Sequence, residues 1–398
     1  MVCAKSKMRL MHLARKYQSI GLITLSLLVG AIMTFIALPF LTRLYSVHDF
    51  GQYGVALAFV SVLSTVANLR LDQALLVAKA EHQKSLIFES SVFSLLFCTV
   101  IAVVIAYVYN AEMAIAIALG VFANTLIQSV YNYKFAHEAE WFCAGLNIFR
   151  SITVVAVQLI LPLIFTINLL NSYSVSSLLL AVVLLFYVLS QRLYEVSWQI
   201  FKNYKDFIFS NTPHALLNSF SHNLPYYVVV HFVGFQSVGF YSIVERTLRV
   251  PINLMSQTIR QFFIRKYKNQ NTPREAFKSS IFLSVLSLPF FAIFFVLPES
   301  FYLLIFGQEW VGISLYFQIL ALGYWAVFCN PPSSAYLIAK RQSNVLFQLQ
   351  IVELIIKFIL FLGLYWLCAD KLYMLVAVPV ALIFYNFSIL ATVWRRPK

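Results

Sequence analysis

Long apolar runs dominate the pattern of hydrophobic and polar positions along this chain. Each run extends for about 20 residues, the length that a helix needs to cross the hydrocarbon core of a bilayer, and short polar or charged segments separate the runs. The pattern predicts twelve membrane-spanning helices, at Ile20–Phe40, Tyr53–Leu69, Phe88–Tyr107, Met113–Tyr131, Ser151–Ile167, Tyr173–Ser190, Pro213–Gly234, Gly239–Ile259, Ser279–Val296, Gly312–Ile338, Val345–Leu367 and Leu372–Val393.

The basic residues collect in every second connecting segment, as the positive-inside rule expects. With both termini in the cytoplasm, 24 of the 29 Lys and Arg residues fall on the cytoplasmic side, Arg43 and Lys371 fall outside, and three lie within spans. A missed or extra helix would reverse the side of every later segment. The charge distribution therefore favours both the number of helices and the cytoplasmic placement of the termini.

The composition places the chain in a membrane. Of its 398 residues, 61% are hydrophobic and 11% are charged, and the mean hydropathy is +0.80. These values exclude an ordinary soluble domain. The net charge of +14 does not indicate nucleic-acid binding, because the basic residues follow the membrane topology instead of clustering on a soluble face. The basic segment Met1–Lys16 is expected to remain in the protein ahead of the first span, since no small-residue cleavage site follows.

Several kinds of chemistry have no signature here. The sequence contains no GxxxxGK[ST] phosphate-binding loop, no serine nucleophile motif and no Cys/His metal pattern. Its five cysteines have no paired or metal-ligand spacing. We therefore expect no enzyme activity and no cofactor, so any movement of a substrate across the membrane must draw on an ion gradient or on consumption of that substrate at the far side.

One spanning stretch, Gly239–Phe263, carries the charges Glu245, Arg246 and Arg249. An arginine at the centre of a spanning helix costs about 2.5–3.5 kcal/mol, so such residues normally face a bundle interior or an aqueous cavity. Glu245 and Arg249 are four residues apart and can neutralise each other on one helix face, whereas Arg246 has no such local partner. With a kink expected at Pro251, the stretch predicts a bent cationic helix that lines an anion-accepting cavity. A structural ion network around Glu245 is the alternative.

Three further sites merit attention. Glu353 and Lys357 repeat the four-residue spacing in the eleventh span, where they could belong to the same cavity, to a proton relay, or to a mutually neutralised pair. Arg70, at the cytoplasmic edge of the second span, is either a topology anchor or the first half's contact with an anionic substrate. The polar start of the seventh span, with His222 and Pro225, suggests local unwinding or a hinge beside water.

The chain is expected to consist of two halves, 1–200 and 201–398, each with six helices. The mixed aromatic and basic segment Gln199–Asn211 lies between them. At an offset of 188 residues, Gly51 corresponds to Gly239 and Tyr53 to Tyr241. An offset of six helices gives two copies with the same orientation in the membrane, which is the parallel repeat of many transporters, and these bind substrate between the halves.

Four stretches carry a family resemblance over essentially the whole chain. They are RLYSVHDFGQYGVALAFVSVLSTVANLRLDQALLV (Arg43–Val77), KNYKDFIFSNTPHALLNSFSHNLPYYVVVHFVGFQSVGFYSI (Lys202–Ile243), LIFGQEWVGISLYFQILALGYW (Leu304–Trp325) and PPSSAYLIAKRQSNVLFQLQIVELIIK (Pro331–Lys357). In order and spacing they resemble the polysaccharide-biosynthesis flippases of the Wzx type, which belong to the multidrug/oligosaccharidyl-lipid/polysaccharide exporter superfamily.

The resemblance implies an all-α polytopic membrane protein with two six-helix bundles around a central cavity, in a bacterial inner membrane. It also implies a flippase that moves an undecaprenyl-diphosphate-linked oligosaccharide, an O-antigen or capsule repeat unit, by alternating access. Proton or sodium coupling, membrane lipid and a polysaccharide polymerase are the partners that this reading brings with it. Since guanidinium groups match phosphate oxygens in bidentate geometry, the expected substrate contacts are Arg246, Arg249, Glu245, Lys357, Glu353 and Arg70.

Two other functions compete with this interpretation. A cation-coupled exporter of drugs or small molecules in the same superfamily often uses an acidic residue in an early helix, and Ile20–Phe40 contains no ionisable side chain. A membrane glycosyltransferase, polymerase or ligase acting on the same lipid would be expected to carry a large external loop with charged catalytic residues. The longest predicted external loop is only Leu297–Val311.

Overall fold

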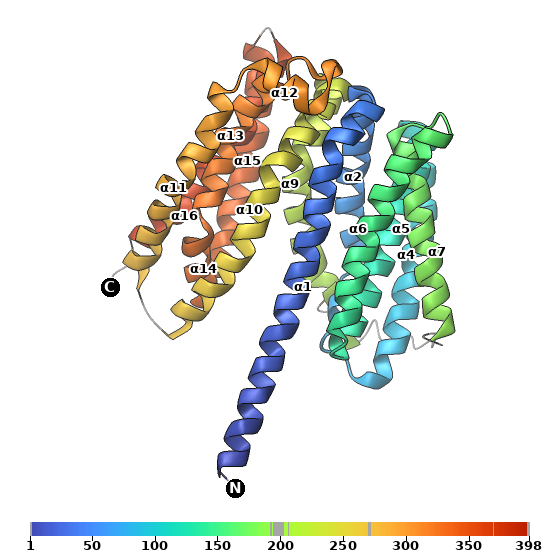
Figure 1. The fold of residues 1–398 in the computed structure, drawn as a ribbon, viewed down its shortest axis with the longest axis vertical. Helices are drawn as coiled ribbons and strands as arrows, with labels where there is room; N and C mark the ends of the chain where they lie inside the picture. The colour runs from blue at the N-terminus through green and yellow to red at the C-terminus, as the bar shows by residue number, and fades with distance from the viewer. Residues whose placement is uncertain are drawn as a thin grey trace. The chain divides into compact units, whose positions relative to one another are not determined.

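The computed structural model of the protein describes residues 2–191, 193, 203–205, 207–269, 272–368 and 370–395, and its described elements are helices (Figure 1). In chain order they are α1 (Val2–Leu44), α2 (Val47–Ala67), α3 (Leu71–Ala74), α4 (Ala80–Val108), α5 (Ala111–Ala136), α6 (Glu140–Ile164), α7 (Leu169–Ser190), η1 (Phe207–Asn211), α9 (Thr212–Phe232), α10 (Phe235–Asn269), α11 (Pro273–Val296), α12 (Glu299–Phe306), η2 (Gln308–Trp310), α13 (Ile313–Cys329), α14 (Pro331–Ala339), α15 (Ser343–Leu367), η3 (Lys371–Val376) and α16 (Ala377–Trp394).

The helices confirm the predicted all-helical membrane fold. Within the described part of the chain, nine helices are long and apolar enough to cross a membrane, and α13 with α14 forms a tenth, bent span. Helices α9 and α10, with 21 and 35 residues, occupy the two remaining predicted spans and are more polar. The twelve predicted segments therefore correspond to helices in the same order.

The tenth span differs from the single helix predicted at Gly312–Ile338. It breaks at Asn330, and α13 and α14 meet at 41°. The physical reason is the pair Pro331 and Pro332, which cannot donate backbone hydrogen bonds to the last turn of α13. The local unwinding predicted near Pro225 does not occur, because α9 is a continuous helix from Thr212 to Phe232.

The chain divides into two compact units. Unit 1 contains Met1–Leu44 and Ala56–Phe220, and unit 2 contains Tyr45–Val55 and Ser221–Lys398. Helix α2 therefore contributes its first half to unit 2 and its second half to unit 1, whereas α9 contributes its first half to unit 1 and its second half to unit 2. The predicted boundary between residues 200 and 201 lies outside the described residues.

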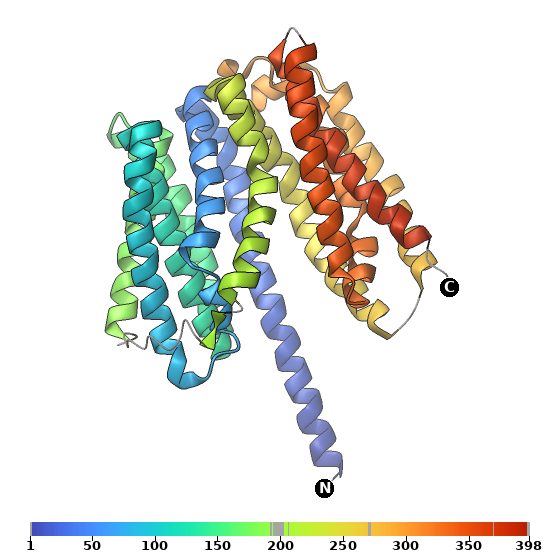
Figure 2. The same cartoon turned by 180° about the vertical axis from the view of Figure 1, so that it is seen from behind.

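Unit 1 is a bundle of α1, α4, α5, α6 and α7 with the second half of α2 (Figure 2). Small and polar side chains let its helices approach closely, as is usual where helices pack in lipid. Asn147 of α6 donates a hydrogen bond to Ser26 of α1 over 3.1 Å, and the hydroxyls of Ser94 and Thr125 pair at 2.7 Å between α4 and α5. These polar contacts add to a buried apolar cluster in the same unit, which includes Leu86 of α4, Leu126 of α5 and Leu184 of α7.

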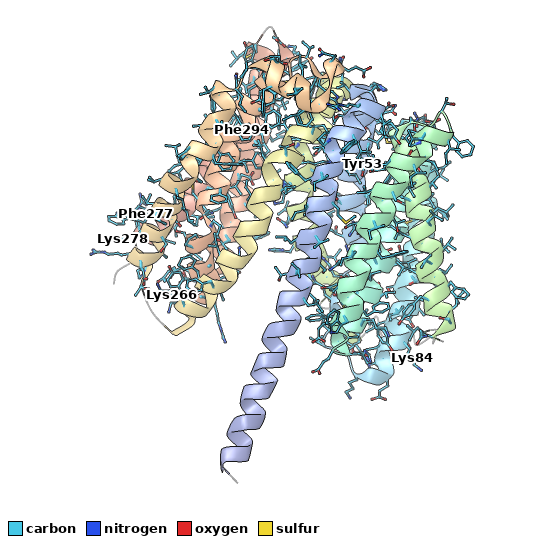
Figure 3. All side chains as sticks on the ribbon, in the orientation of Figure 1. Tyr53, Lys84, Lys266, Phe277, Lys278 and Phe294 are labelled. Carbon is cyan, nitrogen blue, oxygen red and sulfur yellow. The ribbon has the colours of Figure 1, made fainter. Side chains whose placement is uncertain are left out.

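In unit 2, helices α10, α11, α15 and α16 pack around the broken span that α13 and α14 form. Asn386 of α16 reaches the break, where its side-chain oxygen accepts a hydrogen bond from Asn330 at 2.7 Å. A basic end is visible in Figure 3, where Lys266 and Lys278 lie at one end of the unit and Phe294 lies further along α11. Both lysines therefore lie at the same end of the unit, and the cytoplasmic placement of that end stays a prediction.

Candidate functional site

Helix α10 carries three charges deep within its span. Arg246 is eleven residues from the helix start at Phe235, roughly 17 Å along the axis at 1.5 Å per residue. Glu245 is buried, with 5% of its surface exposed, whereas Arg246 and Arg249 are half-buried. The helix therefore places charged groups well away from both of its ends.

Glu245 and Arg249 form the predicted ion pair. Their atoms Oε1 and Nη2 are 2.7 Å apart, and the two side chains are 7% and 39% exposed. Glu245 has a second partner, because the Tyr226 hydroxyl of α9 donates a hydrogen bond to its other oxygen. The buried Tyr324 of α13 also lies near both members of the pair. Glu245 thus connects α10 to α9, while the Arg249 side chain stays partly exposed.

Arg246 has a different environment. Its guanidinium carbon lies 4.7 Å from the centre of the Tyr53 ring, which is a cation–π contact with one face of the group. Among the described residues, no hydrogen bond or ion pair is found for its N–H groups. An arginine stacked in this way keeps its in-plane donors available for an anion.

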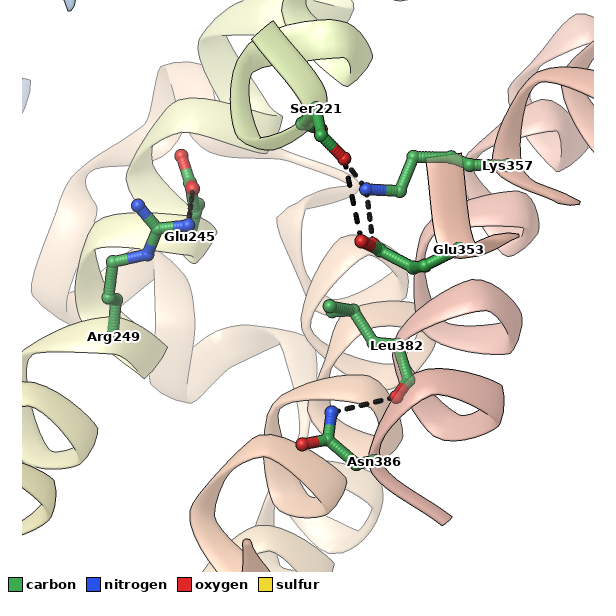
Figure 4. Close-up of polar contacts among 7 residues, drawn as sticks. All are labelled: Ser221, Glu245, Arg249, Glu353, Lys357, Leu382 and Asn386. Carbon is green, nitrogen blue, oxygen red and sulfur yellow. Dashed lines mark hydrogen bonds and ion pairs between the residues drawn. The ribbon is translucent and has the colours of Figure 1, made fainter. Parts of the chain in front are cut away.

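The pair on α15 is closed off. Lys357 Nζ and Glu353 Oε1 are 2.6 Å apart, and the two side chains are only 4% and 7% exposed. Lys357 also donates to the backbone carbonyl of Ser221 at 3.2 Å, and the Ser221 hydroxyl donates to the second Glu353 oxygen at 3.4 Å (Figure 4). The predicted ion pair is present, and its charges are satisfied inside the protein.

The charges of these two pairs and Arg246 do not cancel. Three cations stand against two carboxylates, so one positive charge remains, and the cation without a carboxylate partner is Arg246. His222 follows Ser221 on α9 and has an exposed side chain. Its ring lies close enough to Arg249 and Lys357 to interact electrostatically with both. These groups of unit 2 therefore carry a net positive charge.

Arg70, the remaining candidate, belongs to unit 1. It lies in the turn between α2 and α3 with a left-handed backbone (φ 55°), next to Leu69 (φ 47°). Its charge acts on Asp72, which is buried at 3% exposure and accepts a hydrogen bond from Asn132 at 3.2 Å. Arg70 therefore belongs to a different unit from the charges on α10 and α15.

Sequence reasoning missed the tyrosines of the site. Tyr53 covers Arg246, Tyr226 binds Glu245, and Tyr324 is buried beside the Glu245–Arg249 pair. A signal existed for Tyr53, since it corresponds to Tyr241 at the offset of 188 residues. Nothing in the sequence pointed to its contact with Arg246, because that contact joins helices far apart in the chain.

Solved structures share this arrangement of helices. An inward-facing multidrug resistance MATE family transporter of the MOP superfamily has a TM-score of 0.67 and 12% identity, covering 94% of this chain and 99% of that one. The MATE multidrug transporter DinF-BH has a TM-score of 0.60 and 12% identity, with 94% and 95% covered. The inward closed lipid II flippase MurJ has a TM-score of 0.59 and 14% identity, with 93% and 88% covered. No curated protein sequence matches the chain.

The fold and its charged spans define a multi-pass membrane protein with the architecture of MOP-superfamily transporters. Residues 40–315, well over half of the chain, match the family described as Polysaccharide biosynthesis protein. The protein belongs to this family, which confirms the resemblance seen in its sequence.

Proposed function

We propose that this protein is a flippase that moves a polyprenyl-diphosphate-linked oligosaccharide across the bacterial inner membrane by alternating access. Its membership in a polysaccharide biosynthesis family and its transporter fold support this function. The substrate is the undecaprenyl-diphosphate-linked repeat unit of an O-antigen or a capsule. Both termini lie in the cytoplasm, and a proton or sodium gradient or a polysaccharide polymerase on the far side drives the cycle.

The observation that carries the proposal is the state of Arg246. A cation at bilayer depth is costly unless something compensates its charge, and among the described residues the guanidinium stacks on the face of Tyr53 and has no carboxylate partner. A diphosphate group supplies what is missing, because two of its oxygens match the in-plane N–H groups of a guanidinium. In this proposal, Arg246 binds the headgroup of the lipid substrate.

Arg249 is the second contact. It is 39% exposed although it is paired with Glu245, so its remaining N–H groups can reach the same anion. Glu353 and Lys357 are too enclosed for this role and serve instead to hold α9 against α15. This assigns substrate binding to α10 and structural support to α15.

The test is restoration of surface polysaccharide in a host that lacks its own flippase and carries the matching glycan pathway. We expect Arg246→Ala to abolish export and Arg246→Lys to keep part of it, since lysine retains the charge but not the bidentate fork. Lys371→Ala is the matched control, because Lys371 also stacks on a tyrosine, Tyr365, at 4.1 Å, but lies at the first residue of the last candidate span. Full export by Arg246→Ala, at equal protein level, would contradict the proposal.

A cation-coupled exporter of drugs or small molecules is the competing function. It requires carboxylates, not guanidinium groups, to contact the substrate, so binding of a cationic dye should depend on Glu245 and be insensitive to Arg246→Ala. If the protein is a flippase, binding of a lipid diphosphate should instead depend on Arg246 and should not require the carboxylate of Glu245.

A further inference from the structure

Two glycines let α2 and α10 touch through their backbones. A side chain at Gly51 would collide with the carbonyl oxygen of Phe235, and a side chain at Gly239 would collide with the carbonyl oxygen of Val47. On α2, Gly51 lies four residues after Val47, whose carbonyl contacts Gly239. On α10, Gly239 lies four residues after Phe235, whose carbonyl contacts Gly51. All four residues belong to unit 2.

This crossing is symmetric in the repeat. The offset of 188 residues relates Gly51 to Gly239, and it also relates Val47 to Phe235. The contact is therefore made twice, each time by equivalent positions of the two repeat copies, as in an interface about a two-fold axis. Closely packed glycine pairs allow helices in membranes to approach until their backbones touch. Here the two helices are so close that not even the methyl group of an alanine would fit at Gly51 or Gly239.

Tyr53 follows Gly51 by two residues on α2, and its ring covers Arg246 of α10. The side of α2 just beyond it also packs tightly, because a side chain at Gly54 would meet Ser242 and Tyr226 at 3.1 Å. The ring can lie over the guanidinium only while α2 and α10 are in contact. The cation–π stack and the glycine crossing thus form one continuous contact between these helices.

We propose that Tyr53 is a positioning residue that makes the anion affinity of Arg246 depend on closure of the Gly51–Gly239 crossing. While the crossing is closed, the Tyr53 ring fixes the plane of the guanidinium and presents its free edge to an anion. When α2 leaves α10, Arg246 loses this support and its hold on the anion weakens. This inference rests on the proposed function, in which Arg246 binds the diphosphate of the substrate.

By linkage, the dependence runs in both directions. An anion that binds better to the closed crossing also stabilises the closed crossing by the same factor. Opening of α2 from α10 therefore accompanies release of the headgroup. The device couples a change in helix packing to a change in affinity through one aromatic ring.

The experiment measures the dissociation constant of farnesyl diphosphate for the purified full-length protein in nanodiscs, with farnesol as the ligand that lacks the diphosphate. We expect Tyr53→Leu to weaken binding about tenfold and Tyr53→Phe to leave it within about twofold, since phenylalanine keeps the ring face. We expect Gly51→Ala and Gly239→Ala, which do not contact the ligand, to weaken it as Tyr53→Leu does. Gly363→Ala is the matched control, because a side chain at Gly363 would meet nothing within 4 Å.

The outcomes separate the inference from the proposed function. If the wild-type protein does not distinguish farnesyl diphosphate from farnesol, the proposed function fails. If it does, and Arg246→Ala abolishes the difference while Tyr53→Leu binds as the wild type does, then the function stands and the role of Tyr53 is wrong. Equal weakening by Tyr53→Phe and Tyr53→Leu would also overturn it. If the glycine variants do not fold, the comparison of the two Tyr53 variants still decides.

Discussion

The ammonium group of Lys357 donates a hydrogen bond to the backbone carbonyl of Ser221 over 3.2 Å. In a regular helix, that carbonyl would accept from the N–H group of the residue four positions later, which here is Pro225. Proline has no N–H group, so α9 cannot satisfy this carbonyl by itself. Lys357 replaces the missing donor from α15 and explains why α9 stays helical through its proline.

Loss of this lysine is expected to destabilise the protein. Lys357→Met leaves Glu353 as a buried carboxylate without its cation and Ser221 without a donor, and breaking a buried ion pair in this way costs about 3–5 kcal/mol. We expect a clear drop in the midpoint of thermal unfolding in detergent. The exposed Lys278→Met is a control that should leave the midpoint unchanged.

A second substitution tests the explanation itself. Pro225→Ala restores an N–H group at the position that Ser221 needs, so it should recover part of the stability that Lys357→Met removes. The unpaired Glu353 remains in the double variant, and recovery is therefore incomplete. Additive losses in the double-mutant cycle would show that Lys357 does not substitute for the proline N–H.

The helices of this protein follow from the sequence because the bilayer imposes one length and one hydrogen-bonding pattern on every span. The pairs Glu245–Arg249 and Glu353–Lys357 follow as well, since a spacing of four residues fixes neighbours on one helix. The support of Lys357 for α9 could not be predicted in this way. It joins Ser221 to a helix more than a hundred residues later, and only packing determines which helices meet.

The same distinction applies to the break at Asn330. Two consecutive prolines mark it in the sequence, yet the apolar run Gly312–Ile338 is continuous, and hydropathy alone reads it as one span. Tyr53 and Arg246 are a case in which the sequence indicated the residues but not the contact between them. Each residue was noted in the sequence, one in the repeat and one among the charges, and only their contact between helices gives them a joint role.

Removing the charge of Glu245 is expected to strengthen anion binding. Glu245→Gln keeps an oxygen that can accept from Tyr226 but releases Arg249 from its ion pair. A second unpaired guanidinium then faces the anion, and the dissociation constant of farnesyl diphosphate should fall severalfold and depend more steeply on salt. Weaker binding of the diphosphate by this variant would argue against Arg249 as a substrate contact.

The hydrogen bond between Asn330 and Asn386 is expected to fix the broken span. Asn386 donates to the carbonyl of Leu382 at 2.7 Å, which orients its amide so that its oxygen accepts from Asn330. Asn386→Leu leaves the buried Asn330 amide without this acceptor, at a cost of about 1–3 kcal/mol. Thermal unfolding should show this loss. The exposed Asn203→Leu serves as a control, and an equal midpoint for the wild type and Asn386→Leu would contradict the assignment.

Asp72, in the connection between α2 and α4, should make stability depend on pH. Burial raises the pKa of its carboxyl above the ordinary value of 3.8, although the nearby Arg70 lowers it in part. A raised pKa in the folded state means that folding favours the neutral acid. The contribution to the free energy of unfolding is therefore fully present below the unfolded-state pKa and is lost as the pH rises through the folded-state pKa.

Asp72→Asn removes this dependence while retaining a side-chain oxygen for the hydrogen bond from Asn132. The variant should gain stability relative to the wild type when thermal unfolding in detergent is compared between about pH 4 and about pH 7, because only the wild type has to bury a charge at the higher pH. Glu138→Gln, at an exposed position, should show no such change. A variant that loses stability relative to the wild type at the higher pH would mean that Arg70 stabilises the ionised carboxylate by more than burial costs.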